Sequence, residues 1–111
     1  MESGNAQDQP IAIVTLDEFL KDKRSIKLNK TFLKIDVQGF EKNVLLGGKY
    51  SLLEIPVVLA ECVLNSLYEE SSDLITIIEL MKEKGFMVAA IHSDYWFNGF
   101  SPDCDVIFTR V

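Results

Sequence analysis

The chain has 111 residues, of which 48% are hydrophobic and 25% charged, and its formal net charge at pH 7 is −6. This size and composition are typical of one globular domain that forms an ordinary core without disulfides. The negative charge argues against a nucleic-acid partner, which requires clustered cationic side chains. No apolar stretch reaches the roughly 18 residues of a membrane span. We therefore expect a cytoplasmic domain that contacts neither nucleic acid nor membrane.

The first ten residues, MESGNAQDQP, lack the apolar segment of a secretory signal. We interpret residues 1–10 as a flexible leader or an expression remnant, and residues 11–111 as the domain. Ile11 to Val14 is then a short β-branched run.

Helix and strand patterns alternate in the first half of the domain. Thr15 and Glu18 have the spacing of a capping box at the start of a short helix. Gly47 and Gly48 end a second helix, where we expect glycine to adopt the left-handed conformation. The expected elements are a helix from Leu16 to about Asp22, a strand from Thr31 to Val37, a helix from Glu41 to Leu46 and a turn from Tyr50 to Leu53.

The second half continues the alternation. The clearest helix, Asp73 to Lys84, is capped by Ser71 or Ser72 and ended by Gly85. Its apolar face, at helical spacing, consists of Leu74, Ile77, Ile78 and Met81. The strands expected here are Val57 to Cys62, Phe86 to His92 and Asp105 to Arg110.

This order predicts an α/β fold. Continuous apolar strands that alternate with helices favour a mostly parallel sheet covered on both faces. The last connection has no helix pattern, so we expect the final strand to be antiparallel. Cys62 and Cys104 lie in or beside apolar segments without metal-ligand spacing. We interpret them as buried free thiols, with a disulfide as the alternative.

Two carboxylates mark a candidate site. Asp36 and Glu61 stand near the carboxyl ends of successive strands, where open α/β sheets bind ligands. They could act as general bases on a hydroxyl group, or bind an amine or a metal. Alternatively, Asp36 caps the turn at Gln38-Gly39 and Glu61 binds loop amides. His92 is the only histidine, and we interpret it as structural. No metal-ligand spacing occurs, so we expect no metal site, and no dinucleotide-binding fingerprint occurs either.

The segments TLDEFL, LKIDVQGFEKNVLLGG and VVLAEC, followed by Gly85-Phe86 and a terminal D-x-x-F at Asp105 to Phe108, resemble the carboxyl-terminal half of the FkbM-type methyltransferases. The resemblance implies part of a Rossmann-like class I methyltransferase sheet that uses S-adenosylmethionine to methylate a hydroxyl group on a sugar or small metabolite. It assigns catalysis to Asp36 and Glu61. Gln38, Gly39 and Glu41 would lie beside substrate or cofactor, although Gln38 stands where the family usually has Glu.

The family's Gly-rich turn and its acidic ribose-binding position have no counterpart here. From the resemblance we expect a fragment, inactive by itself, that lacks the main cofactor-binding half. The strand at residues 33–37 would then be an exposed edge, open to self-association or covered by Ile11 to Val14. The alternative is a non-catalytic α/β module that self-associates or assembles with a partner chain.

Overall fold

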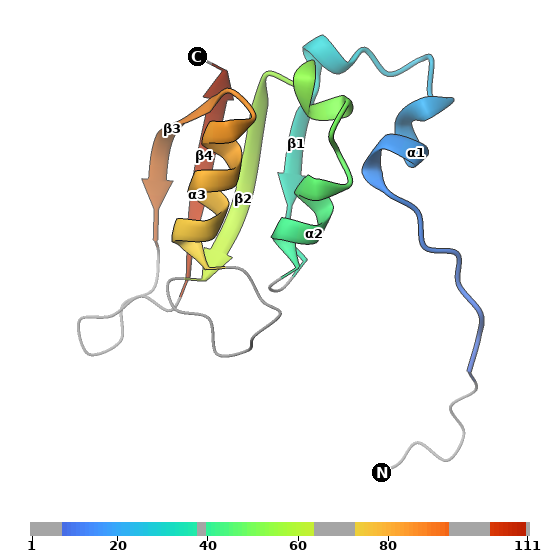
Figure 1. The fold of residues 1–111 in the computed structure, drawn as a ribbon, viewed down its shortest axis with the longest axis horizontal. Coiled ribbons are helices and arrows are strands. Elements are labelled where there is room, and N and C mark those ends of the chain that lie inside the picture. The colour runs from blue at the N-terminus through green and yellow to red at the C-terminus, as the bar shows by residue number, and fades with distance from the viewer. Residues whose placement is uncertain (1–7, 38–39, 64–72, 94–102, 111) are drawn as a thin grey trace.

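The computed structural model describes residues 8–37, 40–63, 73–93 and 103–110. Within these residues four strands form a single sheet, and α2 and α3 pack against it (Figure 1). The strands are β1 (Phe32–Ile35), β2 (Val57–Val63), β3 (Phe86–His92) and β4 (Asp103–Arg110); the helices are α1 (Leu16–Lys21), α2 (Glu41–Leu46) and α3 (Leu74–Glu83), with 3₁₀ turns at Leu28–Lys30 and Ser51–Leu53.

The sheet is mixed, with strand order β1-β2-β4-β3. β1 and β2 pair in parallel, and β4 pairs antiparallel with both β2 and β3. The expected antiparallel last strand is confirmed, but the expectation of a mostly parallel sheet needs correction, because β4 inserts between β2 and β3 and makes two of the three pairings antiparallel. β1, β2 and β3 nevertheless point in the same direction, so their carboxyl ends share one edge of the sheet (Figure 1).

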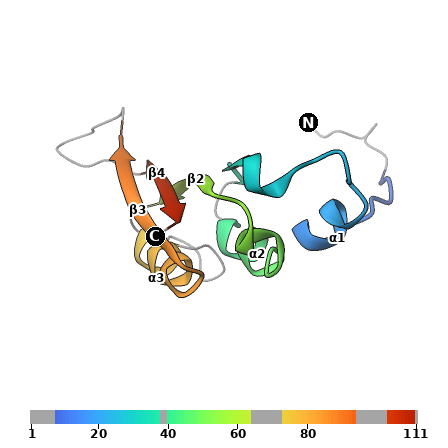
Figure 2. The same cartoon turned by 90° about the horizontal axis from the view of Figure 1, so that it is seen from above.

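Helices cover only one face of the described sheet, which corrects the expectation of cover on both faces. α2 and α3 lie on the same side (Figure 2), and we call this side the covered face and the opposite side the open face. Alternate residues follow this division, as strand geometry requires. Val58, Ala60 and Cys62 of β2 are buried on the covered face, whereas Val57, Leu59, Glu61 and Val63 point to the open face and are half-buried.

β1 is an edge strand, and among the described residues it pairs only with β2. The Ile11 to Val14 segment has no regular structure, and its Ile13 is 89% exposed. This segment therefore does not cover the β1 edge, contrary to one of the two expectations. The strand is shorter than the expected Thr31 to Val37, so Lys34 lies within it and Asp36 directly follows it; both side chains are exposed.

The helix ends follow local side-chain chemistry. The Glu18 N–H donates to Thr15 Oγ1 at the start of α1, as the capping spacing predicted. At α3 the cap is Asp73, whose carboxylate accepts from the Thr76 N–H at 2.9 Å. The predicted caps, Ser71 and Ser72, lie outside the described residues.

The three helix-ending glycines serve different needs. Gly85 has φ of 89°, a conformation that favours glycine, and it ends α3 as expected. Gly47 is right-handed, with φ of −77°, so the prediction of a left-handed end is wrong there. A Cβ at Gly47 would lie 3.2 Å from the Cβ of Thr15, and one at Gly48 would lie 3.0 Å from Leu16 Cδ2. Close approach of α1, and not backbone conformation, explains these two glycines.

The core lies between the covered face and the helices. Ile77 and Met81 of α3 are buried there as their spacing predicted, and Leu74 and Ile78 pack around them. Both cysteines are buried free thiols, which confirms that interpretation. None of the described helices combines the length and apolar character needed to cross a bilayer.

Candidate active site

Asp36 and Glu61 meet at the carboxyl edge of the sheet. β1 and β2 run in parallel, with Ile35 opposite Ala60. The residues that follow these two, Asp36 and Glu61, therefore lie side by side on the open face. The Asp36 side chain is close enough to raise the pKa of Glu61, both by hydrogen bonding to its protonated form and by its negative charge. Asp36 is exposed and Glu61 is half-buried within β2. The sequence prediction that these two carboxylates share one edge agrees with this geometry.

The environment of Glu61 favours its protonated form. The pKa of Glu61 is raised from 4.5 to about 7. Burial is the largest cause, and the hydrogen bond and negative charge of Asp36 act in the same direction. The charges of Asp103 and Asp105 add smaller contributions. Two carboxyl groups in contact cannot both ionise easily, so the pair holds one proton up to near neutral pH.

Sequence reasoning missed the part that β4 plays at this edge. Because β4 is antiparallel, its first residues lie where the other strands end, and Asp105 is directly opposite Glu61. On the other side of β4, His92 is opposite Asp105. A register shift between Val88 and Ala90 produces this pairing; without the shift His92 would face Cys104 on the covered face. The alternation Asp103-Cys104-Asp105 was the available signal, since residues two apart share a face.

Glu41 supports the turn behind Asp36. It is the first residue of α2, only 1% exposed, and its Oε2 accepts a hydrogen bond from the Val37 N–H at 3.3 Å. This position suits the carboxylate for holding the chain that leaves β1. Gln38 and Gly39, predicted to adjoin substrate or cofactor, lie outside the described residues, so their role stays a prediction.

The arrangement of acids is not that of a metal centre. Among the described residues, no group of three or more His, Cys, Asp and Glu side chains could hold a metal ion. The absence of a metal from the complete site stays a prediction from the sequence.

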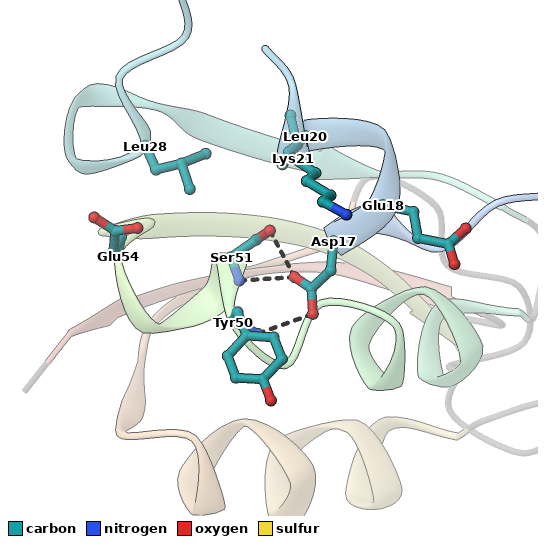
Figure 3. Close-up of a pocket in the computed structure, with 8 residues that line it drawn as sticks. All are labelled: Asp17, Glu18, Leu20, Lys21, Leu28, Tyr50, Ser51 and Glu54. Atoms are coloured by element: carbon teal, nitrogen blue, oxygen red, sulfur yellow. Dashed lines mark hydrogen bonds between the residues drawn. The ribbon is translucent and has the colours of Figure 1, made fainter. Parts of the chain in front are cut away.

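A second polar cluster lies at the opposite edge of the sheet, near the starts of β1 and β2. The Asp17 carboxylate accepts hydrogen bonds from the Tyr50 N–H at 3.0 Å, the Ser51 N–H at 2.8 Å and the Ser51 hydroxyl at 2.7 Å (Figure 3). Burial raises the pKa of Asp17, but these bonds together outweigh it, and the net pKa is lowered from 3.8. The cluster anchors α1 to the turn before β2.

Two cavities lie near α1 rather than near the carboxyl pair. The one of 360 Å³ surrounds the Asp17 cluster. The other, of 670 Å³, lies between the 13–19 segment and α2 and is mainly apolar. Neither is lined by Asp36 or Glu61, so the chemistry and the described cavities are at different places. The smaller cavity is lined by Asp17, Glu18, Leu20, Lys21, Leu28, Tyr50, Ser51 and Glu54. The larger cavity is lined by Ile13, Val14, Thr15, Leu16, Glu18, Phe19, Asn43, Val44 and Gly47.

The carboxyl pair can accept or donate one proton near neutral pH. A base with a pKa near the working pH combines a useful ionised fraction with a real affinity for the proton. Exposure of Asp36 leaves this pair open to a hydroxyl or amine group from solvent. The geometry therefore permits general acid–base chemistry.

Comparison with known families found a match over residues 1–88 to the Methyltransferase FkbM domain. The match includes Asp36, Glu41 and Glu61 and stops before β4. Searches for similar curated proteins and for similar solved structures found no match. Since the family match spans well over half of the residues, the chain belongs to the FkbM methyltransferase domain family.

Proposed function

We propose that this chain acts in S-adenosylmethionine-dependent methylation of a hydroxyl group on a sugar or another small metabolite. Glu61 is the general base, and Asp36 is its hydrogen-bonded partner that orients the acceptor hydroxyl. The observation that carries the proposal is the shared-proton pair, in which the pKa of Glu61 is raised to about 7. The family supports methyl transfer; the acceptor class and the donor are parts of the proposal.

The chemistry follows from the needs of an oxygen nucleophile. When bound, S-adenosylmethionine supplies an electrophilic methyl group on a cationic sulfonium. As the acceptor oxygen took the methyl group and the sulfur of the donor left, the Glu61 carboxylate would accept the hydroxyl proton, with Asp36 orienting the hydroxyl group. The products are a methyl ether, S-adenosylhomocysteine and a proton that later leaves the pair. Most of the rate must come from holding acceptor and methyl group in line.

The side chains at this edge suit such a donor chemically. Asp36, Glu61, Asp103 and Asp105 are acidic, and carboxylates complement the positive charge of a sulfonium or ammonium group. The sequence contains no glycine-rich nucleotide loop. We therefore propose that the chain by itself binds the donor weakly. Asp36 is the more exposed member of the pair, and we propose that it lies nearest to the acceptor.

Titration calorimetry with S-adenosylmethionine tests donor binding, and tight binding would contradict the weak-binding proposal. Turnover is measured as release of S-adenosylhomocysteine, with donor in excess and a panel of sugars and hydroxylated metabolites. The resemblance implied an inactive fragment; with the donor in excess we instead expect acceptor-dependent release, which Glu61→Gln reduces by about 10²–10⁴-fold. Glu79→Gln should leave the release unchanged, because Glu79 is exposed on α3. Release at the wild-type rate in Glu61→Gln would refute the role of Glu61.

We also propose self-association through the edge at residues 33–37. The supporting observation is that β1 pairs only with β2 among the described residues, which leaves one side of its backbone without a neighbouring strand there. Sedimentation velocity should then give a sedimentation coefficient that rises with protein concentration. A value that stays constant, at the monomer mass, would contradict this proposal.

A further inference from the structure

The aspartates of β4 lie close to the carboxyl pair. Asp103 and Asp105 are two residues apart at the start of the strand, so both point to the open face, and both are half-buried. Asp105 is the register partner of Glu61, and Asp103 is the partner of Val63, one pair further along the same face. This part of β4 lies beyond residue 88, where the family match ends.

Charged and titratable side chains face Glu61 from two neighbouring strands. Asp36 approaches from β1, and Asp103 and Asp105 approach from β4. His92 of β3 lies beyond Asp105 in the same row. α2 and α3 are on the opposite face of the sheet. Lys34 of β1 is a cation on the same face, opposite Leu59 and one pair away from Glu61. The side chains beside Glu61 in its own row, Asp36 and Asp105, are both acidic.

We propose that Asp103 and Asp105 are positioning residues for the carboxyl pair: from the neighbouring strand, their charges favour Glu61 as the member of the pair that carries the shared proton. This inference rests on the proposed function, because it concerns which member of the pair exchanges the proton with the acceptor. Glu61, with three aspartates around it, becomes the proton-exchanging group, while Asp36 remains the exposed partner that meets the acceptor.

The physical reason is charge repulsion across partly buried positions. An ionised Glu61 would stand beside three negative charges, and like charges favour the protonated form of a neighbouring carboxyl group. The half-buried setting weakens solvent screening of these interactions. Both aspartates raise the pKa of Glu61, although burial and Asp36 contribute more.

The test is the protonation midpoint of Glu61 itself, followed by ¹³C NMR of its side-chain carboxyl carbon across pH. The Asp103→Asn and Asp105→Asn variants, and the double variant, should lower this midpoint, with the largest shift in the double variant. Glu79→Gln removes one negative charge from α3 and should leave the midpoint unchanged. A folded double variant with the wild-type midpoint would overturn the proposal.

A second measurement does not depend on the folding of any variant. Raising the salt concentration on the wild-type protein screens charges that are partly open to solvent, so the Glu61 midpoint should fall. A midpoint that is insensitive to salt would overturn the proposal by showing that burial and the hydrogen bond alone set it.

The pH profile of methyl transfer separates this inference from the proposed function. We expect the rise in rate with pH to move to lower pH in the double variant. If the NMR midpoint moves but no variant and no wild-type sample transfers methyl groups, the proposed function fails and the role of the aspartates stands. If methyl transfer occurs but neither the midpoint nor the profile moves, the role of the aspartates fails.

Discussion

Asp17 in the first turn of α1 and Glu61 in β2 are carboxylates with opposite kinds of surroundings. Asp17 accepts three hydrogen bonds from Tyr50 and Ser51, and its pKa is lowered although burial acts against this. Glu61 stands among other acids, and burial together with Asp36 raises its pKa to about 7.

The comparison shows how a fold separates anchoring from reactivity. Donors aimed at Asp17 fix its charge, so the group ties two segments together and does not exchange protons near neutral pH. Glu61 faces acceptors and like charges, so its ionised form is costly and its proton is exchangeable in the physiological range. Variants at the two positions should therefore lose different properties.

Removing the charge of Glu61 should affect activity far more than folding. We expect Glu61→Gln to reduce the rate of methyl transfer by about 10²–10⁴-fold, the usual contribution of a general base. The measurement is S-adenosylhomocysteine release at saturating donor. Asp17→Asn, assayed at a temperature where it is folded, should retain most of the activity. Equal losses of activity in the two variants would contradict the assignment of catalysis to Glu61 and anchoring to Asp17.

Removing the carboxylate of Asp17 should affect folding more than activity. Asp17→Ala leaves the buried Ser51 and the Tyr50 N–H without this acceptor, and an unsatisfied buried group costs about 1–3 kcal/mol. The free energy of unfolding, from urea titration, should fall by this order. Asp22→Ala is the matched control, since Asp22 is exposed at the end of α1. An equally large loss there would show that the Asp17 bonds are not the cause.

The two carboxylates should change stability with pH in opposite directions. The pKa of Asp17 is lowered on folding, so its contribution is present above its ordinary value of 3.8 and is lost as the pH falls through its folded value. The pKa of Glu61 is raised on folding, so stability falls as the pH rises from 4.5 to about 7 and then levels. Urea unfolding at pH 4.5, 6 and 7.5 should show a decline that is reduced in Glu61→Gln. A variant with an undiminished decline would contradict this assignment.

Cys62 sharpens the contrast within one strand, because it follows Glu61 but points to the covered face. Burial raises the pKa of the Cys62 thiol to about 12 and also raises that of Cys104. Since the thiolate is the reactive form, we expect both thiols to react with a disulfide reagent slowly in the native protein and rapidly in urea. Fast reaction of the native protein would show that the covered face opens more readily than the packing indicates.

The sequence by itself determined the elements and much of the covered face. Capping at Thr15, the apolar spacing of Ile77 and Met81, and the glycine stop at Gly85 depend on residues close in the chain, so they are visible as local patterns. The pairing of Asp36 with Glu61 followed from the rule that parallel strands end at one edge.

Only the tertiary structure decided the surroundings of that pair. The approach of Asp105 to Glu61 requires β4 to enter between β2 and β3, and the place of His92 depends on a register shift near Val88. Asp17 anchors α1 by bonding to Tyr50 and Ser51, which are 33 and 34 positions away from it in the sequence. These contacts are non-local, and their energies depend on burial and on the charges brought together. Local sequence patterns placed Asp36 and Glu61 at one edge of the sheet, whereas the burial and the neighbouring charges that raise the pKa of Glu61 come only from the folded sheet.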